Sequence, residues 1–164
     1  MTRPLALIAS VVVLGLAVWW LWPRDDEAEI RSILAGLEAA FDDASARRLI
    51  ADFDETWRDL PTGTGRELLR SAATAFFLRE RHPKTRAFDF DLEIDERAAL
   101  VEVRPDRTAS VTVEVEVRRL RDSDEPRTEW RFELRAMLDE RDGRWRITET
   151  DWTTIEGRRP SFSP

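Results

Sequence analysis

The side chains that most enzymes use for chemistry are scarce in this sequence. Its 164 residues include one histidine, His82, and no cysteine or tyrosine. This composition excludes a cysteine nucleophile, a thiolate metal site and a disulfide framework, and most zinc and catalytic-triad arrangements lack parts. Because a helix is disfavoured directly before Pro83, we expect the imidazole of His82 to interact with free helix carbonyls. The alternative is a general base near neutral pH.

Three carboxylates, Asp89, Asp91 and Glu93, are spaced like the ligands of a calcium site. In a strand they would lie on one outer face in a straight row, about 6.6 Å apart for every two residues. Calcium instead needs oxygen ligands around the ion, usually from a loop. We therefore expect neighbouring arginines to pair with these carboxylates, and we predict neither a metal nor a cofactor.

Asp151 is the carboxylate that best fits chemistry in a pocket. It stands beside Trp152, which is out of phase with Trp145 and Ile147. This break in the alternation predicts a β-bulge or a strand end between residues 149 and 151. Asp151 then either points inward, where it could serve as a base, or belongs to a turn or strand end.

Helical periodicity organises the first half of the soluble body. Apolar residues in the segment 27–41 recur at steps of three and four, which predicts an amphipathic helix. The spacing of Thr64 and Glu67 is that of a capping box and predicts the start of a third helix, which must stop before Pro83. A second helix is expected between them, with its apolar side formed by Leu49, Ile50, Phe53 and Trp57.

Alternation with a period of two replaces the helical pattern from residue 88 onward. A strong hairpin signal, Asp142-Gly143, precedes the last strand, which is expected to run to Trp152. Helices first and strands second predict an α+β domain, with helices packed on one face of an antiparallel sheet. The expected strands cover residues 88–94, 100–103, 111–117, 130–138 and 145–152.

An uninterrupted apolar run from Leu5 to Trp22 precedes this domain. As a helix it would span about 27 Å, close to the ~30 Å of a bilayer core. Trp19, Trp20 and Trp22 would then act as membrane anchors at the membrane–water boundary. We expect residues 1–24 to be an uncleaved signal anchor, because cleavage would leave these tryptophans in water; a cleaved signal peptide and a buried core helix are the alternatives.

The expected anchor places the rest of the chain. A short N-terminal tail before a single apolar segment usually stays in the cytoplasm, which predicts a single-pass inner-membrane protein with a periplasmic body. Because Arg3 and Arg24 lie in the anchor, the body has 24 basic and 33 acidic side chains, a net charge of −9. Phosphate backbones would repel it, so no nucleic-acid partner is expected. We assign residues 25–156 to one domain and residues 157–164 to a disordered tail.

The order of elements and the last hairpin resemble the nuclear-transport-factor-2-like superfamily, in particular its SnoaL-like branch. The residues that carry the resemblance are the hairpin Asp142-Gly143-Arg144-Trp145-Arg146-Ile147 with the later Asp151-Trp152. The resemblance covers residues 27–152 and implies a cone, in which three N-terminal helices pack on a curved antiparallel sheet around one apolar pocket. Isomerases and dehydratases of the superfamily use Tyr, Asp or His in that pocket. The sequence offers no residue to which such a role can be carried over, so we assign no catalytic residue.

The same resemblance implies where the pocket opens. Asp54 and Arg58 flank Trp57 near that opening and could bind a polar group of a ligand; the alternative is a solvated helix face. Trp57 and Trp152 lie near the ends of elements, where they either line the mouth of the pocket or belong to the core.

Three hypotheses for function follow. The first is a membrane-anchored, non-catalytic accessory or scaffold module of an inner-membrane assembly, which contacts the bilayer through residues 5–22 and a membrane-protein partner. The superfamily includes bitopic inner-membrane proteins of this plan. The second is a binder of a small hydrophobic ligand or lipid in the cone, which requires an open cavity of at least about 300 Å³. The third is an isomerase or dehydratase that uses Asp151 or Asp54 as a base.

Overall fold

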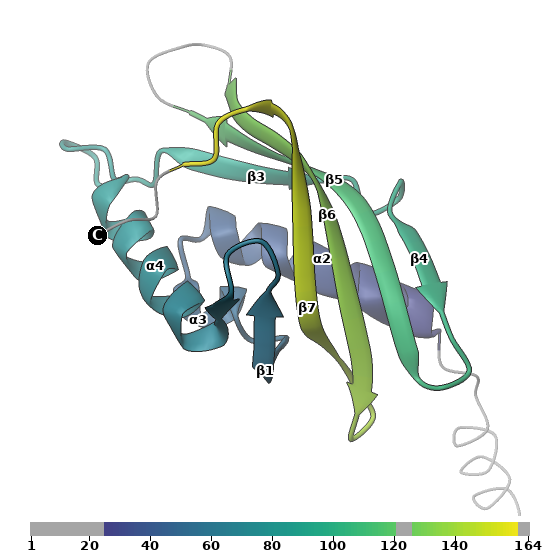
Figure 1. The fold of residues 1–164 in the computed structure, drawn as a ribbon. Coiled ribbons are helices and arrows are strands. Elements are labelled where there is room, and N and C mark those ends of the chain that lie inside the picture. Colours follow the sequence, from purple (N-terminus) through teal and green to yellow (C-terminus); the bar gives the residue numbers. More distant parts are fainter. Residues whose placement is uncertain (1–24, 121–125, 161–164) are drawn as a thin grey trace, which may run out of the picture.

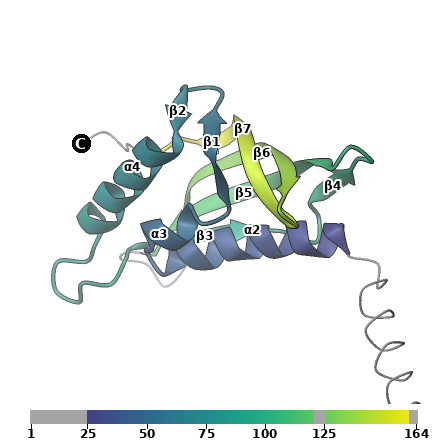
Figure 2. The ribbon, with the colours of Figure 1, turned by 90° about the horizontal axis from the view of Figure 1, so that it is seen from below.

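The computed structural model describes residues 25–120 and 126–160. The predicted anchor, with its three tryptophans, and residues 161–164 lie outside this part of the chain. Within it, no helix is long and apolar enough to cross a bilayer. The described residues form an α+β domain in which helices cover one face of a curved sheet (Figures 1 and 2).

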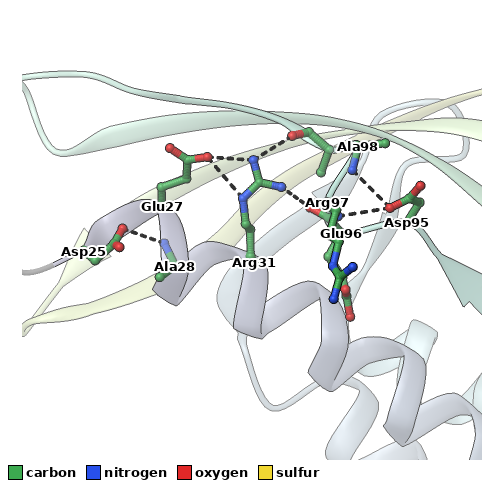
Figure 3. A network of polar contacts seen from close by, with 9 residues as sticks. Asp25, Glu27, Ala28, Arg31, Asp95, Glu96, Arg97 and Ala98 are labelled. Atoms are coloured by element: carbon green, nitrogen blue, oxygen red, sulfur yellow. Dashed lines mark hydrogen bonds and ion pairs between the residues drawn. The ribbon is translucent and has the colours of Figure 1, made fainter.

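Helix α2 (Asp26–Asp42) confirms the first predicted helix. Its N-cap is Asp25, whose side chain accepts a hydrogen bond of 3.0 Å from the backbone N–H of Ala28. Arg31 links the helix to the loop that precedes β4. Its guanidinium donates hydrogen bonds to the carboxylate of Glu27 and to the backbone oxygens of Glu96 and Ala99 (Figure 3). The apolar stripe is buried as expected, at Ile30, Ile33, Leu34, Leu37, Ala40 and Phe41.

The predicted second helix is wrong beyond its first turn. Helix α3 (Ala46–Leu49) is one turn long, and strand β1 (Phe53–Asp59) follows it. Phe53 and Trp57 are four residues apart, which is one helical turn but also two strand repeats, so their spacing fits both structures. Pairing with the neighbouring strand decides the outcome, because β1 hydrogen-bonds along β7 (Arg144–Gly157).

Helix α4 (Arg66–Arg79) begins and ends where the third helix was expected, but it lacks the predicted capping box. Its N-cap is Gly65, which provides no side-chain hydrogen bond. Thr64 belongs to the short strand β2 (Thr64–Gly65), where its hydroxyl oxygen lies 2.6 Å from that of Thr62. The capping box is absent because the helix begins one residue later than its spacing requires, so that Gly65 is the N-cap and Thr64 pairs with Asp59.

The sheet is mixed, so the expected purely antiparallel sheet is corrected. Its order is β2-β1-β7-β6-β5-β3, with β4 paired to β5, and β1 runs parallel to β7 while the other pairs are antiparallel. Figure 2 shows the long strands arching over α2, with α4 to one side. The remaining strands are β3 (Phe90–Ile94), β4 (Leu100–Val103), β5 (Thr108–Arg119) and β6 (Arg127–Arg141).

The β6–β7 hairpin confirms the Asp142-Gly143 signal, since both residues have positive φ. The predicted bulge is present in β7, but one residue earlier than expected. Ile147 pairs with Leu138 and Glu149 with Met137, so Thr148 is the extra residue. The strand continues past Trp152 to Gly157, where φ is +74° and a Cβ would clash with the backbone oxygen of Glu129.

Candidate functional site

A cavity of about 460 Å³ lies between the helices and the inner face of the sheet. Its walls are mostly apolar and come from α2, α4 and the inward positions of the long strands. Trp130 stacks on Phe132 at 3.9 Å between ring centroids and meets Trp152 edge-on at 5.3 Å. Small side chains at Ala72, Ala73 and Ala136 line the same space. Large aromatic walls beside small residues thus leave the cone open.

One carboxylate, Asp59, lies among the lining residues of this cavity, and its side chain is almost fully buried. Its Oδ1 accepts hydrogen bonds from the Thr150 hydroxyl at 3.3 Å and from the indole N–H of Trp152 at 3.2 Å. Its Oδ2 accepts one from the hydroxyl of Thr62. A buried charge needs such partners, and these three donors hold the carboxylate in a fixed position.

Asp59 is not among the predicted site residues, because a helix was expected where the structure has β1. In a helix, Asp59 lies about 200° around the axis from Trp57, given 3.6 residues per turn. In β1 the two residues share one face, since strand side chains repeat every two residues. The sequence signal for Asp59 is therefore its position two residues after Trp57. This spacing indicates a shared face only if the segment is a strand.

Two of the predicted site residues, Trp57 and Trp152, line the cavity. Trp57 is 4 % exposed and contacts Phe53 edge-on at 4.9 Å, and its indole N–H is buried without a hydrogen-bond partner among the described residues. Trp152 is half-buried, and the guanidinium of Arg159 lies 5.2 Å from its ring centroid. The structure therefore places both tryptophans in the cavity wall.

The other three predicted site residues lie outside the cavity. Asp54 accepts hydrogen bonds from the amide and hydroxyl of Thr56, at 2.9 and 2.6 Å, and pairs with Arg141 at 2.9 Å. These bonds from Thr56, followed by the charge of Arg141, lower the pKa of Asp54. Arg58 is exposed on β1.

Asp151 does not point inward, because the bulge at Thr148 turns its neighbours Thr150 and Trp152 toward the cavity. Asp151 instead lies opposite Arg135 on the other face of the sheet, and its carboxylate accepts a bond of 2.8 Å from the backbone N–H of Trp152. Neither Asp151 nor Asp54 is therefore placed to act as a base on a molecule in the cavity.

His82 is also placed differently from the expectation. Its Nδ1 accepts hydrogen bonds from the backbone N–H groups of Lys84 and Thr85, at 3.2 and 3.1 Å. The imidazole thus caps the turn after Pro83 and does not bind helix carbonyls, because the turn brings its own amides to the ring.

Two carboxylates of the predicted row, Asp91 and Glu93 on β3, have an arginine partner as expected, whereas Asp89 lies before the strand and is buried, not on an outer face. Arg118 pairs with Asp91 at 2.8 Å and with Glu93. Within the described ranges, no group of three or more His, Asp or Glu side chains could hold a metal ion.

Comparison with known proteins establishes the fold. No family model and no curated protein matches the chain. Solved structures do: an NTF2-like protein with a cystatin-like fold from Novosphingobium aromaticivorans is 18 % identical, with 88 % of this chain and 90 % of that chain covered and a TM-score of 0.64. Aln2 from a Streptomyces species is 19 % identical, with 80 % of this chain and 93 % of that chain covered and a TM-score of 0.65.

A protein of unknown function with a cystatin-like fold from Nostoc punctiforme is 17 % identical, with 79 % of this chain and 90 % of that chain covered and a TM-score of 0.60. These likenesses confirm the expected fold of the nuclear-transport-factor-2-like, or cystatin-like, type. Identities below 20 % show the fold alone.

Proposed function

We propose that this domain binds a small, mainly apolar molecule in its cavity, with one polar group of that molecule facing Asp59. The observation that carries the proposal is the open volume of about 460 Å³ behind apolar walls. Ligand pockets in proteins span about 300–1,000 Å³ and combine apolar walls with a few placed polar groups. The cavity of this domain has both properties.

The walls supply affinity. Removing apolar ligand surface from water contributes about 25 cal/mol per Å², and the aromatic rings of Trp130, Phe132 and Trp152 offer large flat areas for it.

Asp59 supplies selectivity. A carboxylate has about four acceptor positions, and three are used by Thr62, Thr150 and Trp152. The position left can accept a hydrogen bond from a hydroxyl or an amine, so the ligand we propose carries a donor at one end.

A second candidate is acid–base catalysis, favoured by the same buried carboxylate in the cavity. The described lining residues include no second Asp, Glu, His or Lys that could share acid–base chemistry with Asp59, and this favours binding over catalysis. The accessory-module hypothesis stays a prediction, together with the anchor, the inner-membrane location and the membrane-protein partner, because it depends on residues 1–24.

The test is a fluorescence titration of the full chain with 1-aminoanthracene, an apolar aromatic probe with one amine donor. We expect saturable binding in the unaltered protein and at least tenfold weaker binding in Ala136→Phe, which fills the cavity from β6. Leu100→Phe, on the exposed surface of β4, is the matched control and should bind as the unaltered protein does.

Asp59→Asn separates the two parts of the proposal. It keeps an acceptor oxygen but removes the charge, so the amine probe should bind about tenfold more weakly, since a hydrogen bond to a charged group contributes ~1.5 kcal/mol or more. Equal affinity of the unaltered protein and Ala136→Phe would show that the probe does not enter the cavity.

A further inference from the structure

A second hollow, of about 570 Å³, lies at the end of the sheet where the β6–β7 hairpin meets the start of β1 and of α4. Arg144 and Arg146 alternate with buried Trp145 and Ile147, so this hollow is on the face of β7 opposite the cavity. Four arginines line it: Arg66, Arg141, Arg144 and Arg146. We call this group the arginine hollow.

Three of these arginines have N–H groups without a protein acceptor. Among the described residues the side chain of Arg144 has no hydrogen bond or ion pair, although its backbone pairs with Arg141. Arg146 donates from Nη1 to the backbone oxygen of Ala51 at 2.7 Å. Arg66 donates from Nη2 to the backbone oxygen of Ile50 at 3.2 Å, and its Nη1 lies 3.9 Å from the Glu67 carboxylate. Its Nε is buried without a hydrogen-bond partner in the described part of the chain. Donors from two elements, α4 and β7, thus line one hollow with few acceptors.

The acidic residues of the hollow do not supply the missing acceptors. Asp54 is already bound by Thr56 and Arg141. Glu55 and Asp142 are exposed to solvent and make no ion pair with Arg144 or Arg146. The charge of Arg146 also helps lower the pKa of Asp54, after the bonds from Thr56, which indicates a locally positive potential. This potential stands out on a body with a net charge of −9.

We propose that the arginine hollow binds a phosphate group. Planar guanidinium groups donate in pairs to phosphate oxygens, and charge-assisted bonds of this kind are about twice as strong as neutral ones. Arg66 is also the first residue of α4, so the positive end of the helix dipole adds to the attraction for an anion. The inference does not depend on a ligand in the cavity.

The phosphate can belong to a lipid headgroup or be free in solution. The indole N–H of Trp145 donates to Asp26 at 3.2 Å, so the hairpin lies against the first turn of α2. The chain before Asp25 leads directly to the predicted membrane anchor. If residues 5–22 lie in a bilayer, lipid phosphates would be near this end of the domain.

The experiment is a calorimetric titration of the full chain in mild detergent with inorganic phosphate, at constant ionic strength against chloride. We expect saturable binding, and about tenfold weaker binding in the double variant Arg144→Gln, Arg146→Gln, which removes two charged donors. Arg144→Gln alone breaks no hydrogen bond or ion pair within residues 25–120 and 126–160 and should weaken binding without affecting folding. Arg135→Gln, an exposed arginine of β6 that pairs with Glu133, is the control.

Phosphate that binds no better than chloride, or an Arg135→Gln variant as impaired as the double variant, would overturn the proposal. The source is separated by repeating the titration in nanodiscs of phosphatidylcholine, with and without phosphatidylglycerol, and comparing each Kd with that in detergent, because both lipids carry a phosphate. Weaker binding of inorganic phosphate in either nanodisc identifies the headgroup as occupant, and a Kd unchanged from detergent identifies free phosphate; both support a phosphate site.

Discussion

The indole N–H of Trp152 donates to the carboxylate of Asp59 across the only parallel strand pair in the described sheet, β1–β7, at 3.2 Å. Two features create this contact. The bulge at Thr148 rotates the end of β7 so that Trp152 faces inward, and the strand conformation of β1 turns Asp59 to the same side. The bond therefore connects the carboxylate in the cavity wall with the pairing of β1 and β7.

We predict that Asp59→Ala destabilises the domain by about 1–3 kcal/mol, because the donors of Trp152, Thr150 and Thr62 lose their acceptor and that of Thr150 is buried. Urea unfolding followed by tryptophan fluorescence measures the effect. Asp151→Ala, in which the removed carboxylate bonds only the adjacent backbone N–H, should stay within about 0.5 kcal/mol of the unaltered protein. An equal decrease in the free energy of unfolding for both variants would contradict the stabilising role of the three hydrogen bonds to Asp59.

Two buried tryptophans allow a matched comparison of one hydrogen bond. Trp145 and Trp57 are both nearly inaccessible, but only Trp145 has a partner for its indole N–H among the described residues, namely Asp26. Phenylalanine removes the same atoms at both sites. We predict that Trp145→Phe costs about 1.5 kcal/mol more in unfolding free energy than Trp57→Phe, the value of a hydrogen bond to a charged group. A larger loss for Trp57→Phe would show that its N–H has an unseen partner.

The sequence predicts the correct element wherever the spacing of its apolar residues fits a helix or a strand but not both. In α2 the apolar stripe from Ile30 to Phe41 fits only a helix, and in β5 the alternation of four valines fits only a strand. The prediction failed at Phe53 and Trp57, whose spacing of four belongs to both. Such a segment is decided by tertiary pairing, here with β7, which local sequence does not contain.

The same ambiguity determined what could be predicted of the site. Trp57 and Trp152 were identified because bulky aromatics near element ends line cavities whichever structure carries them. A helix at this position would place Asp54 and Arg58 beside Trp57 and Asp59 away from it, whereas strand β1 places Asp59 on the same face as Trp57. The face on which Asp151 lies depends on where the bulge is. A bulge moved by one residue past a side chain reverses the face of the sheet to which that side chain points.

Glu38 gives a test based on pH. Burial, followed by the repulsion of Asp42, Glu96 and Glu93, raises its pKa above 4.5, although a bond of 2.8 Å from the Ile94 backbone N–H opposes this. A raised folded pKa means that the protonated form is favoured by folding, so stability is lost as the pH rises through it. We predict that Glu38→Gln stabilises the domain by under about 1 kcal/mol at pH 7.

The gain should shrink as the pH falls toward 4.5 and below, where Glu38 itself becomes neutral. Thermal unfolding across this range, compared with the exposed Glu149→Gln on β7, provides the measurement. A gain that grows on acidification would reverse the sign of the argument and show that the bond to Ile94 outweighs burial.

The last prediction concerns the boundary of the domain. Asp25 caps α2, and Asp26 accepts the indole N–H of Trp145, so both residues belong to the folded body. We predict that a chain starting at Asp25 is a folded, soluble monomer, by circular dichroism and gel filtration, whereas the full chain sediments with membranes. Starting at Glu27 instead removes the cap and the bond to Trp145, and should cost about 2 kcal/mol in unfolding free energy. If the chain from Asp25 aggregates, residues 1–24 cover part of the domain and are not a separate anchor.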